Sequence, residues 1–349
     1  MRRVSRIAVA SVATAALAVT VSACGSSSSS NSSGGGDKNA GLALAYDVGG
    51  KGDQSFNDAA TAGMDKADQE FGYKSTAVEP QDGESDADKV QRLETLAKQG
   101  YNPVIGVGFA YAPAVKAAAA KFPKTTFGIV DDNQIKASNV TDLVFHEEQA
   151  SYLAGVAAAK TTKTNTVGFI GGVDVPLIHK FEAGFKQGVA DTKKGVTVKS
   201  QYLTQTAEEG GFSSPDKGEN AANGQIDAGA DVVYAAAGLS GQGVIKAASE
   251  HKIWAIGVDS DQYKQDALAK YKDSILTSAM KDVAGAVYNL AKSVKDGKPQ
   301  TGEVRASLAT GGVSLSDSNP VFKDNADLQA AIKKAAEAIK SGSIKVKDS

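Results

Sequence analysis

Short apolar runs alternate along the chain with longer stretches in which apolar side chains recur at a spacing of about three to four residues. The short runs are typical of buried β-strands, and the periodic stretches are typical of α-helices. We expect strands at 42–48, 74–78, 103–107, 126–130, 140–145, 166–170, 196–203, 231–236, 253–258 and 274–278. We expect helices at 55–71, 86–100, 112–122, 148–160, 177–194, 217–229, 241–250 and 282–296. The last part of the chain adds a strand-like segment at 307–316 and a helix at 324–340.

Strands that alternate with helices predict parallel sheets, because each parallel pairing needs a crossover connection. The pattern is too long for one sheet of roughly five or six strands. We therefore predict an α/β protein with two doubly wound parallel-sheet lobes joined by a hinge. A single eightfold barrel of similar length is the alternative. The expected boundaries are 41–146 plus 279–306 for lobe 1 and 147–278 plus 307–349 for lobe 2.

Three of the predicted strands end in an aspartate, at Asp47, Asp131 and Asp259. In open α/β sheets, ligands bind just beyond the carboxyl ends of the strands. The three carboxylates therefore predict hydrogen-bond acceptors around one polar, uncharged ligand. Asp261 follows Asp259 closely, but no nucleophile nearby makes the two a catalytic pair. A single carboxylate suits a vicinal diol such as that of ribose.

Two aromatic residues lie in loops where a flat ligand could stack on them. Phe56 follows a glycine-rich loop, between Ser55, which could cap the next helix, and Asn57, whose amide could bind a ligand. The alternative role of Phe56 is a hydrophobic staple at the helix start. Phe212 lies in a polar loop without apolar neighbours, so a core position explains it poorly. Aromatic stacking on a heterocyclic base contributes about 1–3 kcal/mol.

A glycine-rich turn and a lysine add two weaker signals. Gly238, Gly241 and Gly243 follow a predicted strand and resemble a phosphate-binding turn, although the spacing is not that of a dinucleotide site. The alternative is a tight turn that lets the backbone approach a neutral ligand. Lys281 could orient Asp259 or bind a sugar oxygen, or it could be a solvated lysine at a helix start.

The N-terminus is typical of a targeting signal. Residues 1–23 combine three arginines with an apolar run that is shorter than the roughly 20 residues of a membrane span. The motif Val21-Ser-Ala-Cys24 resembles a lipoprotein cleavage site and implies a lipid on Cys24, the only cysteine. The alternative is an ordinary secretory signal with an incidental cysteine. Residues 24–40 then form the lipidated cysteine and a flexible serine- and glycine-rich linker.

Composition excludes several classes of function. Removal of the three signal arginines changes the formal net charge from −2 to −5, and this mildly acidic balance argues against a nucleic-acid partner. The three histidines are far apart, and Cys24 lies outside the predicted lobes, so we expect neither a metal site nor a cofactor.

Several short motifs together resemble the basic membrane protein family of transporter substrate-binding lipoproteins, also called the purine nucleoside receptor family. The resemblance covers roughly residues 41–340. Its motifs are Ser55-Phe-Asn57, Gly106-Val-Gly-Phe109, Phe169-Ile-Gly-Gly172, Gly184-Phe-Lys-Gln-Gly188, Gly229-Ala-Asp231, Ala237-Gly-Leu-Ser-Gly-Gln-Gly243, Gly257-Val-Asp-Ser-Asp-Gln262 and Ser278-Ala-Met-Lys281.

This resemblance implies a type I periplasmic-binding-protein-like fold that binds a nucleoside between two lobes and delivers it to an ABC permease and its ATPase. Phe56 and Phe212 would stack on the base, Asp47 and Asn57 would bind its edge, and Asp259 with Lys281 would hold the ribose. The remaining expected ligand-binding residues are Ser55, Phe109, Asp131 and Gly238.

We therefore expect a monomeric binding protein, lipid-anchored on the extracytoplasmic face of a bacterial membrane, and not an enzyme. Two alternatives stay open: a receptor that senses another small polar molecule, and a secreted nucleoside-processing enzyme.

Overall fold

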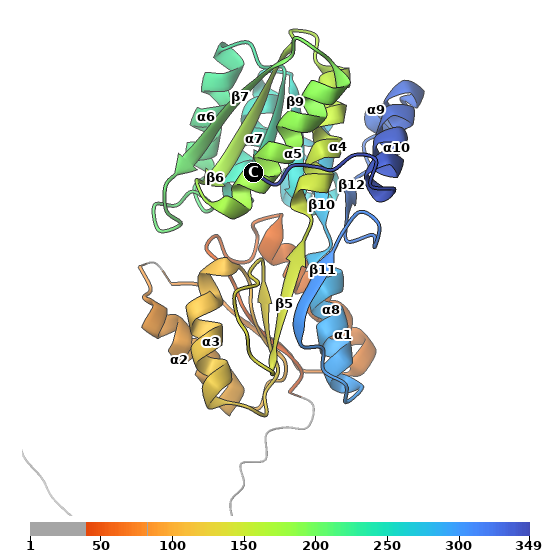
Figure 1. Ribbon diagram of the computed structural model, residues 1–349. Coiled ribbons are helices and arrows are strands. Elements are labelled where there is room, and N and C mark those ends of the chain that lie inside the picture. The colour runs from red at the N-terminus through yellow and green to blue at the C-terminus, as the bar shows by residue number, and fades with distance from the viewer. Residues whose placement is uncertain (1–39, 82) are drawn as a thin grey trace, which may run out of the picture. The chain divides into compact units, whose positions relative to one another are not determined.

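A computed structural model of the chain describes residues 40–81 and 83–349, so the predicted signal, Cys24 and the linker up to residue 39 lie outside the described residues. The described chain contains two six-stranded sheets (Figure 1). The predicted architecture of two parallel-sheet lobes is confirmed, and the single-barrel alternative is wrong, because neither sheet closes on itself.

The first sheet has the strand order β11-β5-β4-β3-β1-β2, and all its pairings are parallel. Its strands are β1 (Ala43–Ala45), β2 (Thr76–Val78), β3 (Val104–Gly106), β4 (Phe127–Val130), β5 (Val140–Phe145) and β11 (Gly302–Ala306). Its helices are α1 (Phe56–Phe71), α2 (Asp86–Lys98), α3 (Ala112–Lys121) and α8 (Val283–Lys295). Helices α1 and α8 cover one face and α2 and α3 the other, which is why β1, β3 and β4 are apolar and fully buried.

The second sheet has the order β12-β10-β9-β8-β6-β7, and only β12 is antiparallel to its neighbour. Its strands are β6 (Thr166–Val173), β7 (Thr197–Thr204), β8 (Val232–Ala236), β9 (Trp254–Asp259), β10 (Ile275–Lys281) and β12 (Val313–Leu315). Its helices are α4 (Glu147–Thr161), α5 (Pro176–Thr192), α6 (Pro215–Asp227), α7 (Gly241–Glu250), α9 (Pro320–Lys323) and α10 (Ala326–Lys340).

The chain passes between the lobes at three places: from β5 to α4, from β10 to α8 and from β11 to β12. The sequence missed β11, because this edge strand has Glu303 and Arg305 in alternation with smaller residues instead of an apolar run. Strand β10 also continues in the second sheet to Lys281, past the lobe boundary that we expected at residue 279. None of the helices in the described residues is long and apolar enough to cross a membrane.

Glycines let helices α4 and α5 pack at backbone contact. A Cβ atom added at Gly188 would lie 2.0 Å from the carbonyl oxygen of Tyr152, and one at Gly155 would lie 2.2 Å from that of Phe185. Neither glycine has a positive φ, so the close approach of the two helices, and not the backbone conformation, requires the missing side chain.

We expect Gly188→Ala to lower the free energy of unfolding by about 1–3 kcal/mol, because the added methyl group forces the two helices apart. Gly224→Ala is the matched control, because Gly224 lies in α6 and a Cβ atom there would meet nothing within 4 Å. This control should be neutral or stabilising by about 0.5–1 kcal/mol. Urea unfolding measures both; equal effects of the two variants would contradict the packing argument.

Candidate ligand-binding site

A cavity lies where the carboxyl ends of strands from both sheets meet. The cavity lining contains nine of the ten residues that the sequence suggested: Asp47, Phe56, Asn57, Phe109, Asp131, Phe212, Gly238, Asp259 and Lys281. The tenth, Ser55, is fully buried behind the wall. Their roles in binding stay a prediction.

The sequence did not suggest the apolar part of this wall. Leu177, Ile178 and Phe181 from α5 line the cavity, together with Ala236 and Ala237 at the end of β8. The periodicity of α5 marked these α5 residues as apolar, but a buried helix face and a ligand-facing one have the same pattern. The cavity therefore combines an apolar wall with a few charged groups at strand ends.

Lys281, at the end of β10, connects the charged groups of the site. Its Nζ lies 2.6 Å from Oδ2 of Asp131 and 3.5 Å from Oδ1 of Asp259. The lysine is only 5% exposed, so the alternative of a solvated helix-start lysine is wrong. Burial opposes the charged form, yet the carboxylates of Asp131 and Asp259 raise the pKa of Lys281. The lysine therefore stays protonated, and its pair with Asp131 joins a strand of each sheet.

The strand-end aspartates Asp131 and Asp259 have an uncommon backbone conformation. Their φ angles are +68° and +61°, in the left-handed region that aspartate tolerates better than most residues. The extended strand therefore stops at both positions, and the two carboxylates line the cavity. One oxygen of each, Oδ1, has no hydrogen-bond partner among the described residues. Oδ1 of Asp259 has only the 3.5 Å ion-pair contact with Lys281, so both oxygens can accept a hydrogen bond from a ligand.

The two predicted stacking residues, Phe56 and Phe212, line the same cavity from different lobes. Phe56 is the first residue of α1, and Nζ of Lys281 lies 4.6 Å from its ring centroid, within the range of a cation–π interaction. Phe212 lies against Gly172, where an added Cβ atom would be 2.3 Å from the Phe212 ring. Phe56 also packs partly against the hydrophobic core, so a staple role remains compatible with its position.

Asp53 organises the loop that carries Phe56. Its carboxylate accepts hydrogen bonds from the backbone N–H groups of Ser55, Asn57 and Asp58 at 2.8–3.1 Å. It also accepts from Nδ2 of Asn57 at 3.1 Å, while Oδ1 of Asn57 accepts from the backbone N–H of Asp47 at 3.0 Å. The Asn57 amide therefore holds the end of β1 in place.

Ser55 connects the two lobes behind the cavity. Its hydroxyl donates to Oδ2 of Asp259 at 2.8 Å, and its carbonyl accepts from the hydroxyl of Ser260 at 2.7 Å. Gln262 adds a further bond from its amide to the carbonyl of Gln54, at 3.1 Å. Ser55 is therefore placed to orient Asp259 instead of lining the cavity.

Asp261 turns away from the cavity. Its carboxylate accepts hydrogen bonds from the hydroxyls of Ser316 and Ser318 at 2.7 and 2.5 Å and lies 3.1 Å from Nζ of Lys264. Burial opposes ionisation, but these partners lower the pKa of Asp261. The structure therefore separates it from Asp259.

The glycine-rich turn is explained by helix packing. A Cβ atom at Gly243 would lie 1.8 Å from the carbonyl oxygen of Pro215, so α6 and α7 pack closely there. Gly238 has a φ of +53° and lies close to the backbone of Phe212. These contacts favour the tight turn over a phosphate-binding turn.

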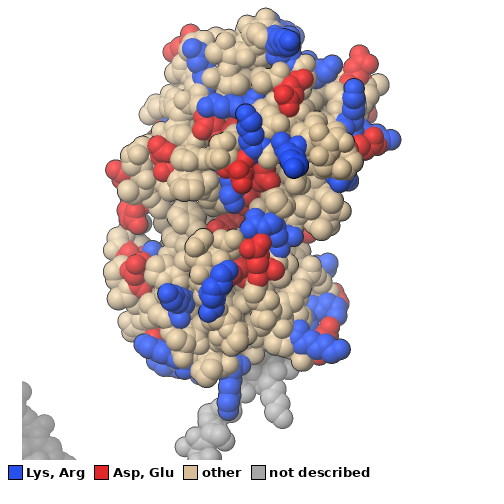
Figure 2. All heavy atoms as spheres, in the orientation of Figure 1, with Lys and Arg blue, Asp and Glu red and all other residues tan. Residues whose placement is uncertain are grey.

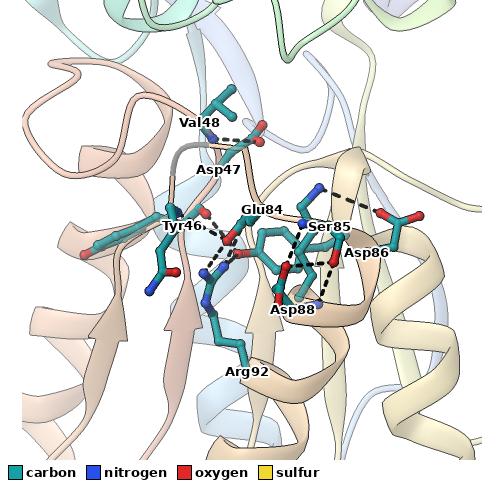
Figure 3. Close-up of polar contacts among 11 residues, drawn as sticks. Tyr46, Asp47, Val48, Glu84, Ser85, Asp86, Asp88 and Arg92 are labelled. Carbon is teal, nitrogen blue, oxygen red and sulfur yellow. Dashed lines mark hydrogen bonds and ion pairs between the residues drawn. The ribbon is translucent and has the colours of Figure 1, made fainter.

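Asp47 lies at the end of β1, above a polar cluster formed by Glu84, Arg92 and Tyr111. Arg92 pairs with Glu84 and donates to the Tyr111 hydroxyl, which donates to the carbonyl of Tyr46 at 3.1 Å. Figure 3 shows the Asp47 carboxylate directed away from this cluster, with one hydrogen bond from the backbone of Val48 at 2.9 Å. Burial raises the pKa of Asp47 to about 7, because the single backbone hydrogen bond compensates only partly.

Comparison with known proteins identifies the family. The family model "ABC transporter substrate-binding protein PnrA-like", named Bmp, matches residues 42–348. The chain belongs to the Bmp family. The family resemblance inferred from the motifs is therefore confirmed, and the chain is an ABC transporter substrate-binding protein.

Individual members and neighbours agree with this assignment. The ABC transporter nucleoside-binding protein BmpA of Lactococcus lactis is 36% identical over 321 residues, which are 87% of this chain and 88% of that protein. A lipoprotein of Pyrococcus horikoshii is 33% identical over 291 residues, or 80% of this chain and 69% of that protein. A solved ABC transporter solute-binding protein of Aeropyrum pernix has a TM-score of 0.75 at 25% identity, with 87% of this chain and 92% of that chain covered.

Membership of the Bmp family implies a small-molecule ligand and a permease with its ATPase as partners. The relative from Lactococcus lactis is named a binding protein, and the names lipoprotein and basic membrane protein of other relatives agree with an extracytoplasmic location. Within the described residues, no cluster of three or more histidine, cysteine, aspartate or glutamate side chains could hold a metal ion.

Two carboxylates of the site, Asp47 and Asp53, predict how stability depends on pH. Burial raises the pKa of Asp47 to about 7 and that of Asp53 to about 6, above the ordinary value near 4. Between about pH 4 and pH 7 the folded state thus binds more protons than the unfolded state. The contribution of the two protonated carboxyl groups to the free energy of unfolding is complete below about pH 4 and is lost as the pH rises through about 6–7.

We therefore expect the melting temperature of the ligand-free protein to fall between about pH 5 and about pH 8. Asp47→Asn should reduce this fall, because the amide does not ionise. Asp327→Asn is the control, because Asp327 is exposed at the start of α10. Scanning fluorimetry across this range measures all three proteins. A melting temperature that is constant or rises, or an equal slope in Asp47→Asn, would contradict the prediction.

Proposed function

We propose that the protein captures a nucleoside, preferentially a purine nucleoside, between its two lobes and delivers it to an ABC importer. The observation that carries this proposal is the meeting of two aromatic residues, Phe56 and Phe212, with the charged pair Asp259 and Lys281 in one cavity. Aromatic rings suit a flat base, and an unpartnered carboxylate oxygen suits a sugar hydroxyl. The printed name of the relative from Lactococcus lactis, a nucleoside-binding protein, supports the same ligand class.

In this proposal each group of residues binds one part of the ligand. Phe56 and Phe212 stack on the base, and Asp47 binds its edge. Asn57 acts chiefly by holding Asp47, since its own amide is already hydrogen-bonded. Asp259 accepts from the ribose hydroxyls through Oδ1, which has no hydrogen-bond partner among the described residues, while Lys281 donates to a sugar oxygen.

The remaining predicted residues shape the site. Phe109, Asp131 and Gly238 line the cavity beside these groups. Ser55 orients Asp259 from behind. Closure of the lobes around the ligand would follow the hinge mechanism common among binding proteins.

Calorimetry on a chain that lacks residues 1–36 tests the nucleoside claim. We expect heat of binding and an affinity of about micromolar or tighter, near −8 kcal/mol, for at least one of adenosine, guanosine, inosine and cytidine. Native mass spectrometry of the purified protein adds a direct view of any retained ligand. The absence of heat with all four nucleosides would overturn the proposal.

Two variants test the stacking roles. Phe56→Ala and Phe212→Ala should each weaken nucleoside binding by about 1–3 kcal/mol if both rings stack on the base. Phe71→Ala is the matched control, because Phe71 ends the same helix α1 that Phe56 begins, and it stacks on Tyr288 instead of lining the cavity. It should change stability without changing affinity. An unchanged affinity in either cavity variant would return that residue to a packing role.

We also propose that a lipid on Cys24 anchors the protein on the outer face of the membrane. Cys24→Ala should move the protein from the membrane fraction to the soluble fraction, because the lipid is lost with the modified cysteine. Ser26→Ala, two residues away in the linker, should leave fractionation unchanged. Membrane fractionation of Cys24→Ala equal to that of the unchanged protein would contradict the anchor.

A further inference from the structure

A second cavity adjoins the main one. Phe109, Asp131 and Leu177 line both cavities, so the two are neighbours. The second cavity is also lined by Glu147, Lys180 and Arg305, among other residues. Figure 2 shows acidic and basic side chains side by side on the face where the two lobes meet. The second cavity therefore offers space next to the proposed ligand site.

Glu147 is a buried carboxylate that none of the roles described so far uses. It is the first residue of α4, directly after a crossing between the lobes, and it is only 2% exposed. Its Oε2 has no hydrogen-bond partner among the described residues, and Nζ of Lys180 lies 3.7 Å away. Burial and the nearby charge of Asp131 raise the pKa of Glu147 to about 7. A buried acceptor without a hydrogen bond is costly, which favours a donor from outside the chain.

Asp131 brings a second free acceptor to the same cavity. Its Oδ2 pairs with Lys281, whereas its Oδ1 has no hydrogen-bond partner among the described residues. Two buried carboxylates, from Asp131 and Glu147, therefore line one space, and one oxygen of each has no hydrogen bond among the described residues.

The cations of this cavity are already paired with carboxylates. Its lining has three carboxylates, from Asp131, Asp132 and Glu147, and two cations, from Lys180 and Arg305. Lys180 lies near Glu147, and Nε of Arg305 donates to Glu303 at 2.7 Å. A phosphate group in this cavity would therefore compete with carboxylates for each of these cations.

The proposed binding mode leaves one sugar substituent to enter this space. The base lies between the aromatic rings and the 2′,3′-diol lies on Asp259 and Lys281, so the 5′ carbon is the part of ribose that remains. We propose that the second cavity receives the 5′ substituent, and that Glu147 and Asp131 select nucleosides whose 5′ group is a hydrogen-bond donor or a cation over nucleoside 5′-phosphates. This inference rests on the proposed nucleoside function.

Three analogues of the tightest-binding nucleoside test the selection: its 5′-deoxy, 5′-amino-5′-deoxy and 5′-monophosphate forms. Their dissociation constants are measured by calorimetry on the full chain. We expect the 5′-amino compound to bind about tenfold tighter than the 5′-deoxy compound, since charge-assisted hydrogen bonds are stronger than neutral ones. The 5′-monophosphate should bind more weakly than the parent nucleoside.

Glu147→Gln should remove most of the difference between the 5′-amino and 5′-deoxy compounds, because the neutral amide no longer attracts the ammonium group. Glu148→Gln is the matched control, since the adjacent Glu148 is also buried but pairs with His146 at 2.7 Å and does not line the cavity. It should keep the full difference. The comparison of analogues on the unchanged protein stands even if a variant fails to fold.

The outcomes separate this inference from the function on which it rests. If no parent nucleoside binds, the proposed function fails and this inference fails with it. If the parent binds but the 5′-amino and 5′-deoxy compounds have equal affinities, only the inference is overturned. Tighter binding of the 5′-monophosphate than of the parent would also overturn it. A difference that persists unchanged in Glu147→Gln would overturn the role of Glu147.

Discussion

The buried ion pair between Lys281 and Asp131 is the interaction on which the site depends. It joins the end of β10 to the end of β4, and Asp259 at the end of β9 completes the group. Charges removed from water are unfavourable unless each has a partner, and loss of one partner from such a pair costs about 3–5 kcal/mol. The three side chains therefore need each other. This requirement fixes the relative positions of strand ends from both sheets.

The neighbouring polar groups also have partners within the protein. One oxygen of Asp259 accepts from Ser55 and one oxygen of Asp131 pairs with Lys281, and the other oxygen of each carboxylate has no hydrogen bond within the described part of the chain. Asp53 fixes the loop before α1 through backbone hydrogen bonds, which sets the positions of Phe56 and Asn57. The polar part of the site is thus mostly committed to internal contacts. Only a few acceptors and two rings remain for a ligand.

Sequence patterns were sufficient for most of the fold. Buried strands such as β5 and helices such as α7 have strong periodicity, and their bounds match the expected ones. Strand β11 was not predicted, because an edge strand with charged residues has no apolar run. The position of Asp47, Asp131 and Asp259 at strand ends predicted that they lie at one edge, and the polar loop around Phe212 predicted that this ring lies outside the core.

Other features of the site depend on contacts between residues far apart in the chain. The hydrogen bond from Ser55 to Asp259 joins residues 204 positions apart, and no local sequence pattern predicts it. The burial of Glu147 at a crossing between the lobes is equally hard to predict from the local sequence. A glutamate in the first turn of a helix is ordinarily solvated and interacts favourably with the helix dipole. Such contacts become visible only when both sheets are in place.

The contact of Ser55 with Asp259 has a consequence for the rate of ligand capture. Because lobe 1 itself satisfies one oxygen of this carboxylate, a hinge closure that keeps this bond would be partly stabilised without a ligand. A closed population that cannot admit a ligand lowers the apparent affinity by the fraction of competent molecules. The observed association rate should then level off at high ligand concentration, at the rate with which the lobes open. In this way one serine hydroxyl would help to set how quickly the receptor can be loaded.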